Sequence, residues 1–256
     1  MLRIATWNVN SLRVRLSHVL DWLAHAQPDI LALQETKLPD EDFPTDSIHQ
    51  SSYQAIYAGQ KTYNGVATLS RQPGTDVITD LPELNDPQRR LLGASYGKVM
   101  VLNVYVPNGA EVSSDKYAYK LEWLSKLHAY IEELLARKPH LIVLGDFNIA
   151  PEDRDVHDPV AWEGKVLVSE PERNQFKRLL ELGLVDCFRV FEQASGHFSW
   201  WDYRAAAFRR NQGLRIDHIL ISSELAKRCT ACYVDKRPRA LDRPSDHVPV
   251  VAEFTL

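Results

Sequence analysis

The sequence has 256 residues, a net charge of −4 and 45% hydrophobic residues, which is enough apolar material for one large core. No apolar run approaches the roughly 20 residues that a membrane-spanning helix needs, and Arg3 and Asn8 interrupt the first ten residues, which excludes the apolar centre of a secretory leader. No linker or repeat divides the chain. We therefore expect one soluble catalytic domain over 1–256, cytoplasmic and monomeric.

Short apolar runs rich in Val, Ile and Leu predict strands. In chain order these runs cover residues 2–10, 29–35, 65–71, 98–108, 140–148, 214–222 and 248–256. Interspersed helices make the pattern mixed α/β. The strands can form two packed sheets between helices, or a single wound parallel sheet, and the apolar pattern does not choose between these architectures.

Three helices are expected between these strands. The first follows Ser11, a candidate N-cap, and its apolar face comprises Leu12, Leu16, Val19, Leu20 and Leu23. The longest runs from about 114 to 137, and its apolar face comprises Tyr117, Leu121, Leu124, Leu127, Ile131 and Leu135. A third, at about 170–182, ends at Gly183.

Cysteine usage and local charge narrow the class of protein. Cys187, Cys229 and Cys232 are an odd, sparse set, typical of reduced thiols, and "CTAC" at 229–232 is a lone pair without zinc spacing.

Ten Lys/Arg against five acids give the stretch 197–243 a charge of +5. Such a stretch suits either a solvated surface or a face that holds phosphates.

Polar side chains stand where several predicted strands begin or end. They are acids, carboxamides, one tyrosine and one histidine: Asn8, Glu35, Tyr105, Asn108, Asp146, Asn148, Asp217 and His247. Any strand that reaches water ends in polar residues, but that does not explain this choice of residue. Oxygen ligands with an imidazole are what a hard divalent cation and a phosphate ester require.

Seven segments in order resemble the exonuclease III type of AP endonuclease, within the endonuclease/exonuclease/phosphatase superfamily that includes deoxyribonuclease I. They are "TWNVNSLR" (6–13), "LALQETK" (31–37), "NVYVPNG" (103–109), "LGDFNIAP" (144–151), "FSWWDYR" (198–204), "GLRIDHIL" (213–220) and "PSDHVPV" (244–250). The resemblance implies a four-layer α/β sandwich, in which two packed mixed β-sheets are flanked by helices.

The resemblance also implies a metal site. Glu35 would be the chief ligand of Mg²⁺, with Mn²⁺ as a substitute, and its place at a strand end would leave the cation partly hydrated. Asn8 and Asn10 would steady the ligands, and Asp246 would lie near the metal.

Phosphodiester hydrolysis needs further groups, which the resemblance supplies. Asp146 would be the general base, and Asn148, two residues further along an extended chain, would hold the phosphate from the same side. Tyr105 and Asn108 would donate hydrogen bonds to the phosphate. A purely structural histidine is the alternative for His247. We instead expect Asp217 to keep it protonated, so that it stabilises charge developing on the phosphate.

DNA is the substrate that the resemblance implies. Trp200, Leu214 and Ile216 would wall an apolar pocket for a flipped sugar without a base, whereas Trp201 is expected in the core. DNA phosphates would contact further polar side chains, namely Arg209, Arg210 and Asn211, with Arg89 and Arg90 as a second contact.

His157 is unusual in this setting. The loop after Asn148 places it where a bulky side chain would obstruct the strand that continues past the scissile phosphate, unless it is an ordinary surface histidine. Incision inside an intact strand would then suffer, while trimming at a nick or a 3′ end would persist.

The expected activity is therefore Mg²⁺-dependent repair of double-stranded DNA at abasic sites, nicks or 3′ ends. Two alternatives are a phosphatase or phosphodiesterase of the same superfamily with a non-DNA substrate, and a DNA-binding relative that has lost catalysis. The second predicts loss of the metal and base positions, yet Glu35, Asp146 and His247 are all present.

Overall fold

The computed structural model of the chain describes residues 1–84, 86–191 and 193–255. Its strands form two six-stranded mixed sheets. The first sheet has the order β11-β12-β1-β2-β4-β3, with bounds Cys229–Val234, Val250–Phe254, Leu2–Asn8, Ile30–Gln34, Val66–Ser70 and Gln54–Ala58. The second has the order β5-β6-β7-β8-β10-β9, with bounds Thr75–Ile78, Leu91–Tyr96, Val99–Tyr105, Leu141–Asp146, Asp217–Ser222 and Leu184–Asp186.

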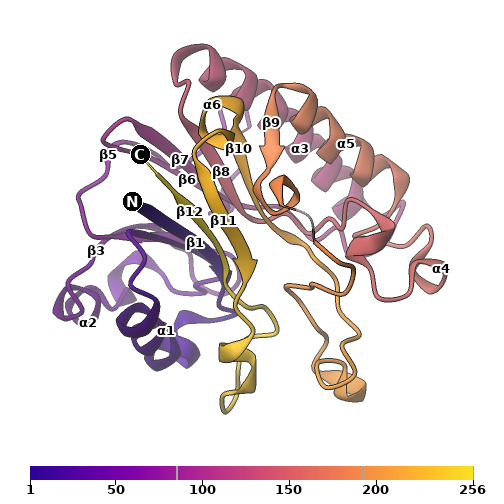
Figure 1. Cartoon of the computed structure of the whole chain (residues 1–256), viewed down its shortest axis with the longest axis horizontal. Helices are drawn as coiled ribbons and strands as arrows, with labels where there is room; N and C mark the ends of the chain where they lie inside the picture. The colour runs from indigo at the N-terminus through magenta and orange to yellow at the C-terminus, as the bar shows by residue number, and fades with distance from the viewer. Residues whose placement is uncertain (85, 192, 256) are drawn as a thin grey trace.

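Helices cover the outer faces of the two sheets (Figure 1). The described helices are α1 Leu12–Ala26, α2 Thr45–Gln50, α3 Asp115–Arg137, α4 Pro159–Trp162, α5 Glu170–Glu181 and α6 Ser223–Ala226. The helices α1 and α2 pack on the first sheet, and α3 and α5 pack on the second. The four-layer sandwich implied by the sequence resemblance is confirmed, and a single wound sheet is wrong.

The alternation of side chains along the central strands explains this layering. In β1, Ile4 points into the core between the sheets, whereas its neighbour Ala5 joins the core under α1. In β7, Val101 belongs to the core between the sheets and Leu102 to the core under α3. Strands that are apolar on both faces must be covered on both faces, which requires four layers.

The predicted strands are present with shorter bounds, and five others went unpredicted. The expected strand at 214–222 begins only at Asp217, because Leu214 instead forms isolated bridges with Val156 and Trp200. Position 256 of the last expected strand lies outside the described residues. The unpredicted strands are β3, β5, β6, β9 and β11. Four of these, β3, β5, β9 and β11, stand at the edges of their sheets. Their sequences contain no long apolar run, which is the signal that predicted the central strands.

Two predictions about helices are wrong in detail. Ser11 precedes α1 but makes no side-chain cap, because its φ is 90° and the amides of Ser11 and Leu12 donate to the carbonyls of Glu35 and Thr36. In α3, Leu121 and Leu135 are only partly buried. The fully buried position beside Leu121 is Lys120.

The three cysteines are free, with Cys187 and Cys232 buried and Cys229 partly exposed. The Sγ atoms of Cys187 and Cys229 lie 3.2 Å apart. Within the described residues, every helix is too short or too polar to cross a bilayer.

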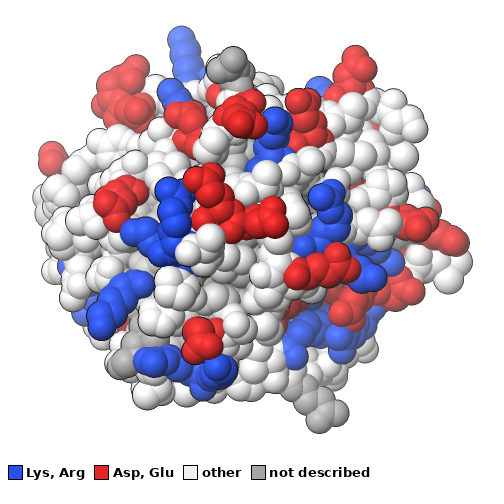
Figure 2. Space-filling view, turned by 90° about the horizontal axis from the view of Figure 1, so that it is seen from above, with Lys and Arg blue, Asp and Glu red and all other residues white. Residues whose placement is uncertain are grey.

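Surface charge at one end of the sandwich is mixed. Figure 2 looks down on the end where α6 follows β10, and Lys/Arg and Asp/Glu side chains alternate over it. Asp217 begins β10 and therefore lies towards the opposite end.

Candidate active site

Three neighbouring strands bring polar side chains together at one end of the second sheet. In the strand register, Tyr105 of β7 lies beside Asp146 of β8, and Asp146 lies opposite Asp217 of β10. Residues directly paired across strands point to the same face of a sheet. The end positions of β7 and β8 and the first position of β10 therefore converge on one point, as the polar strand ends in the sequence indicated.

Asn8, at the end of β1, connects the first sheet to this point. Its buried Nδ2 donates to Glu35 Oε1 and to Asp146 Oδ2, each at 2.9 Å. Both protons of the amide are thus used between two carboxylates that would otherwise repel each other. Asn8 holds the two carboxylates at a fixed separation, although 138 sequence positions separate it from Asp146.

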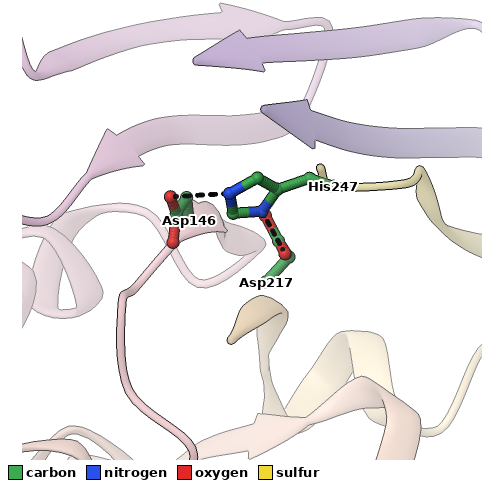
Figure 3. A group of neighbouring side chains, drawn as sticks. All are labelled: Asp146, Asp217 and His247. Carbon is green, nitrogen blue, oxygen red and sulfur yellow. Dashed lines mark hydrogen bonds and ion pairs between the residues drawn. The ribbon is translucent and has the colours of Figure 1, made fainter. Parts of the chain in front are cut away.

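His247 lies between two buried carboxylates (Figure 3). Its Nδ1 is 2.9 Å from Asp217 Oδ2, and its Nε2 is 3.8 Å from Asp146 Oδ2. Burial alone lowers the pKa of His247, but the charges of Asp217 and Asp146 outweigh it and raise the pKa to about 10. Ser199 donates to the same Asp217 oxygen at 2.6 Å and so orients this carboxylate.

For the pKa of Asp146, burial outweighs the effect of the neighbouring positive charge. Burial raises its pKa to about 7, although the positive charge of His247 opposes the rise. Asn148 contacts it, because the Asn148 backbone amide donates to Asp146 Oδ1 at 2.9 Å and its Nδ2 lies 3.3 Å from Oδ2. The predicted extended chain here is wrong: β8 ends at Asp146, and Asn148 has a φ of 51°. This turn returns the carboxamide to Asp146.

Glu35 follows β2 in a left-handed conformation, with a φ of 51°, which a non-glycine residue adopts only at some cost. Its Oε1 accepts from Tyr105 Oη at 2.9 Å, and its Oε2 pairs with Lys37 Nζ at 2.9 Å. Burial opposes ionisation of Glu35, but Lys37 and Asn8 lower its pKa overall. Burial also raises the pKa of Tyr105, so this phenol remains a donor at neutral pH.

Asn10 and Asp246 lie on the other side of Lys37. Asn10 Oδ1 accepts from Lys37 Nζ at 2.6 Å, and its Nδ2 donates to Asp246 Oδ1 at 2.9 Å. Asp246 Oδ2 accepts from the Trp200 indole at 3.0 Å. Asn10 thus reaches Glu35 indirectly, through Lys37 and through Asn8, whose Oδ1 accepts from the Asn10 amide at 3.0 Å.

The donor set fits a divalent cation. Among the described residues, Glu35 pairs with Lys37, and Asp146 and Asp217 lie beside His247, whereas Asp246 accepts from the amide of Asn10 and the indole of Trp200. The buried Asp217 Oδ1 has no hydrogen-bond partner within the described residues. Asp146, Asp217 and His247 each offer an atom within 4.8 Å of the others, but His247 is held protonated and cannot ligate a cation, so the carboxylates supply the donors. Excess negative charge on oxygen donors suits a hard cation.

A cavity of about 680 Å³ opens beside Glu35 and Tyr105. Asn108 and Arg90 line it, and the guanidinium of Arg90 lies 4.6 Å from the centre of the Tyr105 ring. Arg89 is instead paired with Asp80 at 2.9 Å. Of the two arginines, Arg90 is the one at the cavity.

The residues predicted to wall an apolar pocket lie together, but two of the three are buried and leave little open space between them. Leu214 and Ile216 are 0% and 1% exposed, packed in a cluster with Val156, and only Trp200 keeps a partly exposed face. His157 follows Val156, and its Nδ1 lies 3.2 Å from the carbonyl of Gly213. His157 is therefore at the edge of this cluster.

The loop before β10 carries the three side chains predicted to contact DNA phosphates, of which Asn211 is hydrogen-bonded within the protein. Arg209 and Arg210 are exposed. Asn211 has its amide engaged within the protein, since Oδ1 accepts from the Trp201 indole at 3.2 Å and Nδ2 donates to the Gly196 carbonyl at 3.0 Å. Trp201 is fully buried, so its expected place in the core is confirmed.

The pattern of the Endonuclease/Exonuclease/phosphatase family matches residues 5–247. The chain belongs to that family. Exodeoxyribonuclease III of Haemophilus influenzae is 35% identical over 99% of this chain and 100% of its own length. Among solved structures, a 3′-5′ exonuclease from Neisseria meningitidis is 46% identical with a TM-score of 0.98, and an AP endonuclease from Archaeoglobus fulgidus is 40% identical with a TM-score of 0.96; each comparison covers 100% of both chains.

A further solved structure, titled as a 3′ phosphatase from Neisseria bound to a product DNA hairpin, is 46% identical over 100% of both chains, with a TM-score of 0.98. The family match, 5–247, contains every site residue predicted from the sequence, from Asn8 to His247. Within the family's segments, sequence reasoning missed Lys37 and Ser199. Lys37 stands two positions after Glu35 in "QETK", and this proximity was the available signal.

Proposed function

We propose that this protein is a monomeric, Mg²⁺-dependent DNA-repair phosphodiesterase that acts mainly at 3′ ends of duplex DNA. The observation that carries the hydrolytic activity is the buried cluster in which a protonated imidazole lies between Asp146 and Asp217. The relatives named as exodeoxyribonuclease III and 3′ phosphatase support DNA as the substrate.

The chemistry follows from the charges of these groups. Protonated His247 donates to a non-bridging phosphoryl oxygen and stabilises the charge that develops there. With its pKa raised to about 7, Asp146 can take a proton from the attacking water near neutral pH. Bound Mg²⁺, held by Glu35 with Asn8, Asn10 and Asp246 around it, would neutralise phosphate charge and polarise the phosphoryl group.

The neutral donors complete phosphate binding. Asn108 Nδ2 donates to Asn148 Oδ1 at 3.1 Å, so the two amides form one unit that adds no charge. Asn108 keeps its second amide proton for the phosphate, while Asn148 Nδ2 contacts the Val106 carbonyl at 3.0 Å and would turn from it to donate. Tyr105 adds a phenolic donor from the neighbouring strand end. Exposed Arg209 and Arg210 suit contacts with the DNA backbone further out.

Two features favour 3′-end processing over internal abasic-site incision. A flipped sugar needs an exposed apolar wall, yet Leu214 and Ile216 are almost completely buried. His157 adds a bulky side chain at the edge of the same cluster. The 46% identity to a 3′ phosphatase and to a 3′-5′ exonuclease points in the same direction.

The test compares two DNA substrates with one enzyme preparation. We expect kcat/KM for release of a 3′-phosphate at a nick to exceed that for incision at an internal abasic analogue by about 100-fold or more, a difference of about 3 kcal/mol in transition-state energy. EDTA should abolish both activities, and Mg²⁺ should restore them. Equal rates on the two substrates would contradict the 3′-end preference, and undiminished cleavage in EDTA would contradict the metal.

His157→Gly tests the cause of the preference. Removing the imidazole should raise internal incision about tenfold or more and leave 3′-phosphate release within about threefold. His140→Gly is the matched control, because His140 is a partly buried loop histidine at the opposite end of β8 from Asp146. Unchanged incision in His157→Gly would refute the obstruction.

A further inference from the structure

A buried ion pair lies directly behind the phosphate-binding amides. The side chains of Lys120 in α3 and Glu172 in α5 are both 0% exposed and are joined by a hydrogen bond between Lys120 Nζ and Glu172 Oε1. Lys120 Nζ also donates to the carbonyl of Asn148 at 2.7 Å and to that of Asn108 at 3.1 Å. The three protons of the ammonium therefore have three acceptors, which leaves none unsatisfied.

The pair is fully satisfied from the Glu172 side as well. Glu172 Oε1 accepts from the Leu167 amide at 3.0 Å, and Oε2 accepts from the amide of Ser169 at 3.2 Å and from its hydroxyl. The bond from the Ser169 amide is one half of the capping box of α5, in which the Glu172 backbone amide in turn donates to the Ser169 side chain. Glu172 thus anchors the ammonium to a rigid helix end, and the ammonium reaches from there to two loops.

Stability alone does not account for this arrangement. Desolvating two charges costs about as much as their attraction returns, so well-packed apolar residues of similar volume would serve the core equally well. Lys120 does more than fill space, because the two carbonyls it binds belong to Asn108 and Asn148, the two amides proposed to hold phosphate. Gly109, with a φ of 93°, lets the first loop lie against the Lys120 stem, where an added Cβ would be 3.1 Å from Cδ.

We propose that Lys120 is a positioning residue that sets the phosphate-binding geometry of Asn108 and Asn148 by holding both of their carbonyls. This inference rests on the proposed function of those amides. The ammonium does not contact substrate itself, since it is completely buried. It acts by fixing where the two loops end relative to Asp146, and misplacing reacting groups by about 1 Å can cost on the order of 100-fold in rate.

The decisive variant removes both charges together. Lys120→Met with Glu172→Gln keeps the volumes and leaves no unpaired buried charge, so the protein should retain its fold, with a Tm lowered by the loss of the hydrogen bonds to the two carbonyls. We expect kcat for 3′-phosphate release to fall about 10- to 100-fold, with KM changed less than about threefold. A stable double variant with parent kcat would overturn the proposal.

Glu172→Gln alone separates the ion pair from the carbonyl contacts. It leaves the buried ammonium without its counter-charge and should lower the Tm. Lys120 keeps its bonds to both loops, so kcat of the folded enzyme should stay within about threefold of the parent. A loss as large as in the double variant would overturn the proposal, because the effect would then come from α5. If the double variant does not fold, Glu172→Gln still decides, because a loss of kcat of more than about threefold in this single variant would overturn the proposal. Lys126→Met, a partly exposed lysine of α3, is the matched control and should leave kcat unchanged.

A readout independent of turnover separates this inference from the proposed function. In protein labelled with ¹⁵N-asparagine, the side-chain amide resonances of Asn108 and Asn148 should shift in the double variant and stay in place in Lys126→Met. Unmoved resonances would overturn the positioning role even if 3′-phosphate release fell. If the parent enzyme released no 3′-phosphate, the proposed function would fail, while shifted resonances would still support positioning by Lys120.

Discussion

The charge of His247 is decided by its two neighbours rather than by its own chemistry. An exposed imidazole is mostly neutral at pH 7, but the carboxylates of Asp217 and Asp146 keep this one protonated well above neutral pH. The sequence resemblance paired His247 with Asp217 rather than with the adjacent Asp246 of "SDH". Asp217, 30 positions earlier, is the partner that touches its Nδ1, and Asp246 bonds Asn10 and Trp200.

Replacing His247 by Asn should reduce kcat by about 100- to 10,000-fold, because the amide cannot supply a positive charge to the phosphate. The measurement is steady-state release of 3′-phosphate at pH 7.5, with circular dichroism to show that the fold is intact. His18→Asn, on the far side of the sheet in α1, is the control and should keep parent activity. A folded His247→Asn enzyme with near-parent turnover would exclude this role.

At the scale of elements, a buried ion pair ties the loop that carries His157 to the segment that leads into β10. Asp155 accepts from Arg215 Nε at 2.6 Å and from Nη2 at 3.2 Å, and both side chains are essentially inaccessible. The Arg215 amide also donates to the Asp155 carbonyl at 2.9 Å. Loop and strand are thus one unit, which explains why His157 stays beside Leu214 and Ile216.

Asp155→Asn should destabilise the fold by roughly 3 kcal/mol, because it leaves the buried guanidinium of Arg215 short of negative charge. Urea unfolding at pH 7 measures this loss. In Asp155→Leu with Arg215→Met the lost stability should not return, because Asp186, which pairs with Arg215, and Arg189, which pairs with Asp155, then lose these partners. The exposed pair of Glu224 and Lys227 supplies the control, and Glu224→Gln should give no resolvable change. A stable Asp155→Asn protein would contradict the structural role of the pair.

At the scale of the whole molecule, one completely buried histidine couples folding to pH. His218 in β10 has Nδ1 3.0 Å from Arg215 Nη1 and Nε2 2.8 Å from the Ile149 carbonyl. Burial, with the nearby charge of Arg215, lowers its pKa to about 4 from the usual 6.5. The folded protein therefore holds His218 neutral at pH values where the unfolded chain protonates it.

The direction in which stability changes with pH follows from this difference in the pKa of His218 between the folded and unfolded states. Between pH 6.5 and 4 the unfolded state binds the extra proton, so stability falls as the pH drops, and His218 should account for about 2 kcal/mol of the loss between pH 7 and 4.5. Urea unfolding of His218→Gln should show a loss smaller by that amount, and His25→Gln, an exposed control on α1, should match the parent. Identical pH dependence in parent and His218→Gln would contradict this account.

Local sequence pattern was sufficient for the central elements. Long apolar runs located β1, β2, β7 and β8, and the polar residues at their ends located the site, because the residues of a strand that is buried on both faces change character only where the strand leaves the core. The ordered segments, once matched to a family, also indicated two sheets and a role for Glu35, Asp146 and His247. Those roles remain predictions: His247→Asn tests the role of His247, and removal of the metal by EDTA tests the cation that Glu35 is expected to hold.

The tertiary structure alone decided which distant groups touch. No local sequence signal indicates that Asn8 bridges Glu35 and Asp146. Nor does the local sequence indicate that Leu214 and Lys120 are completely buried. Burial depends on what packs against a position, and the acceptors that let Lys120 enter the interior come from three separate segments. The sequence therefore determined which chemical groups the site contains, whereas packing decided how they are charged and held.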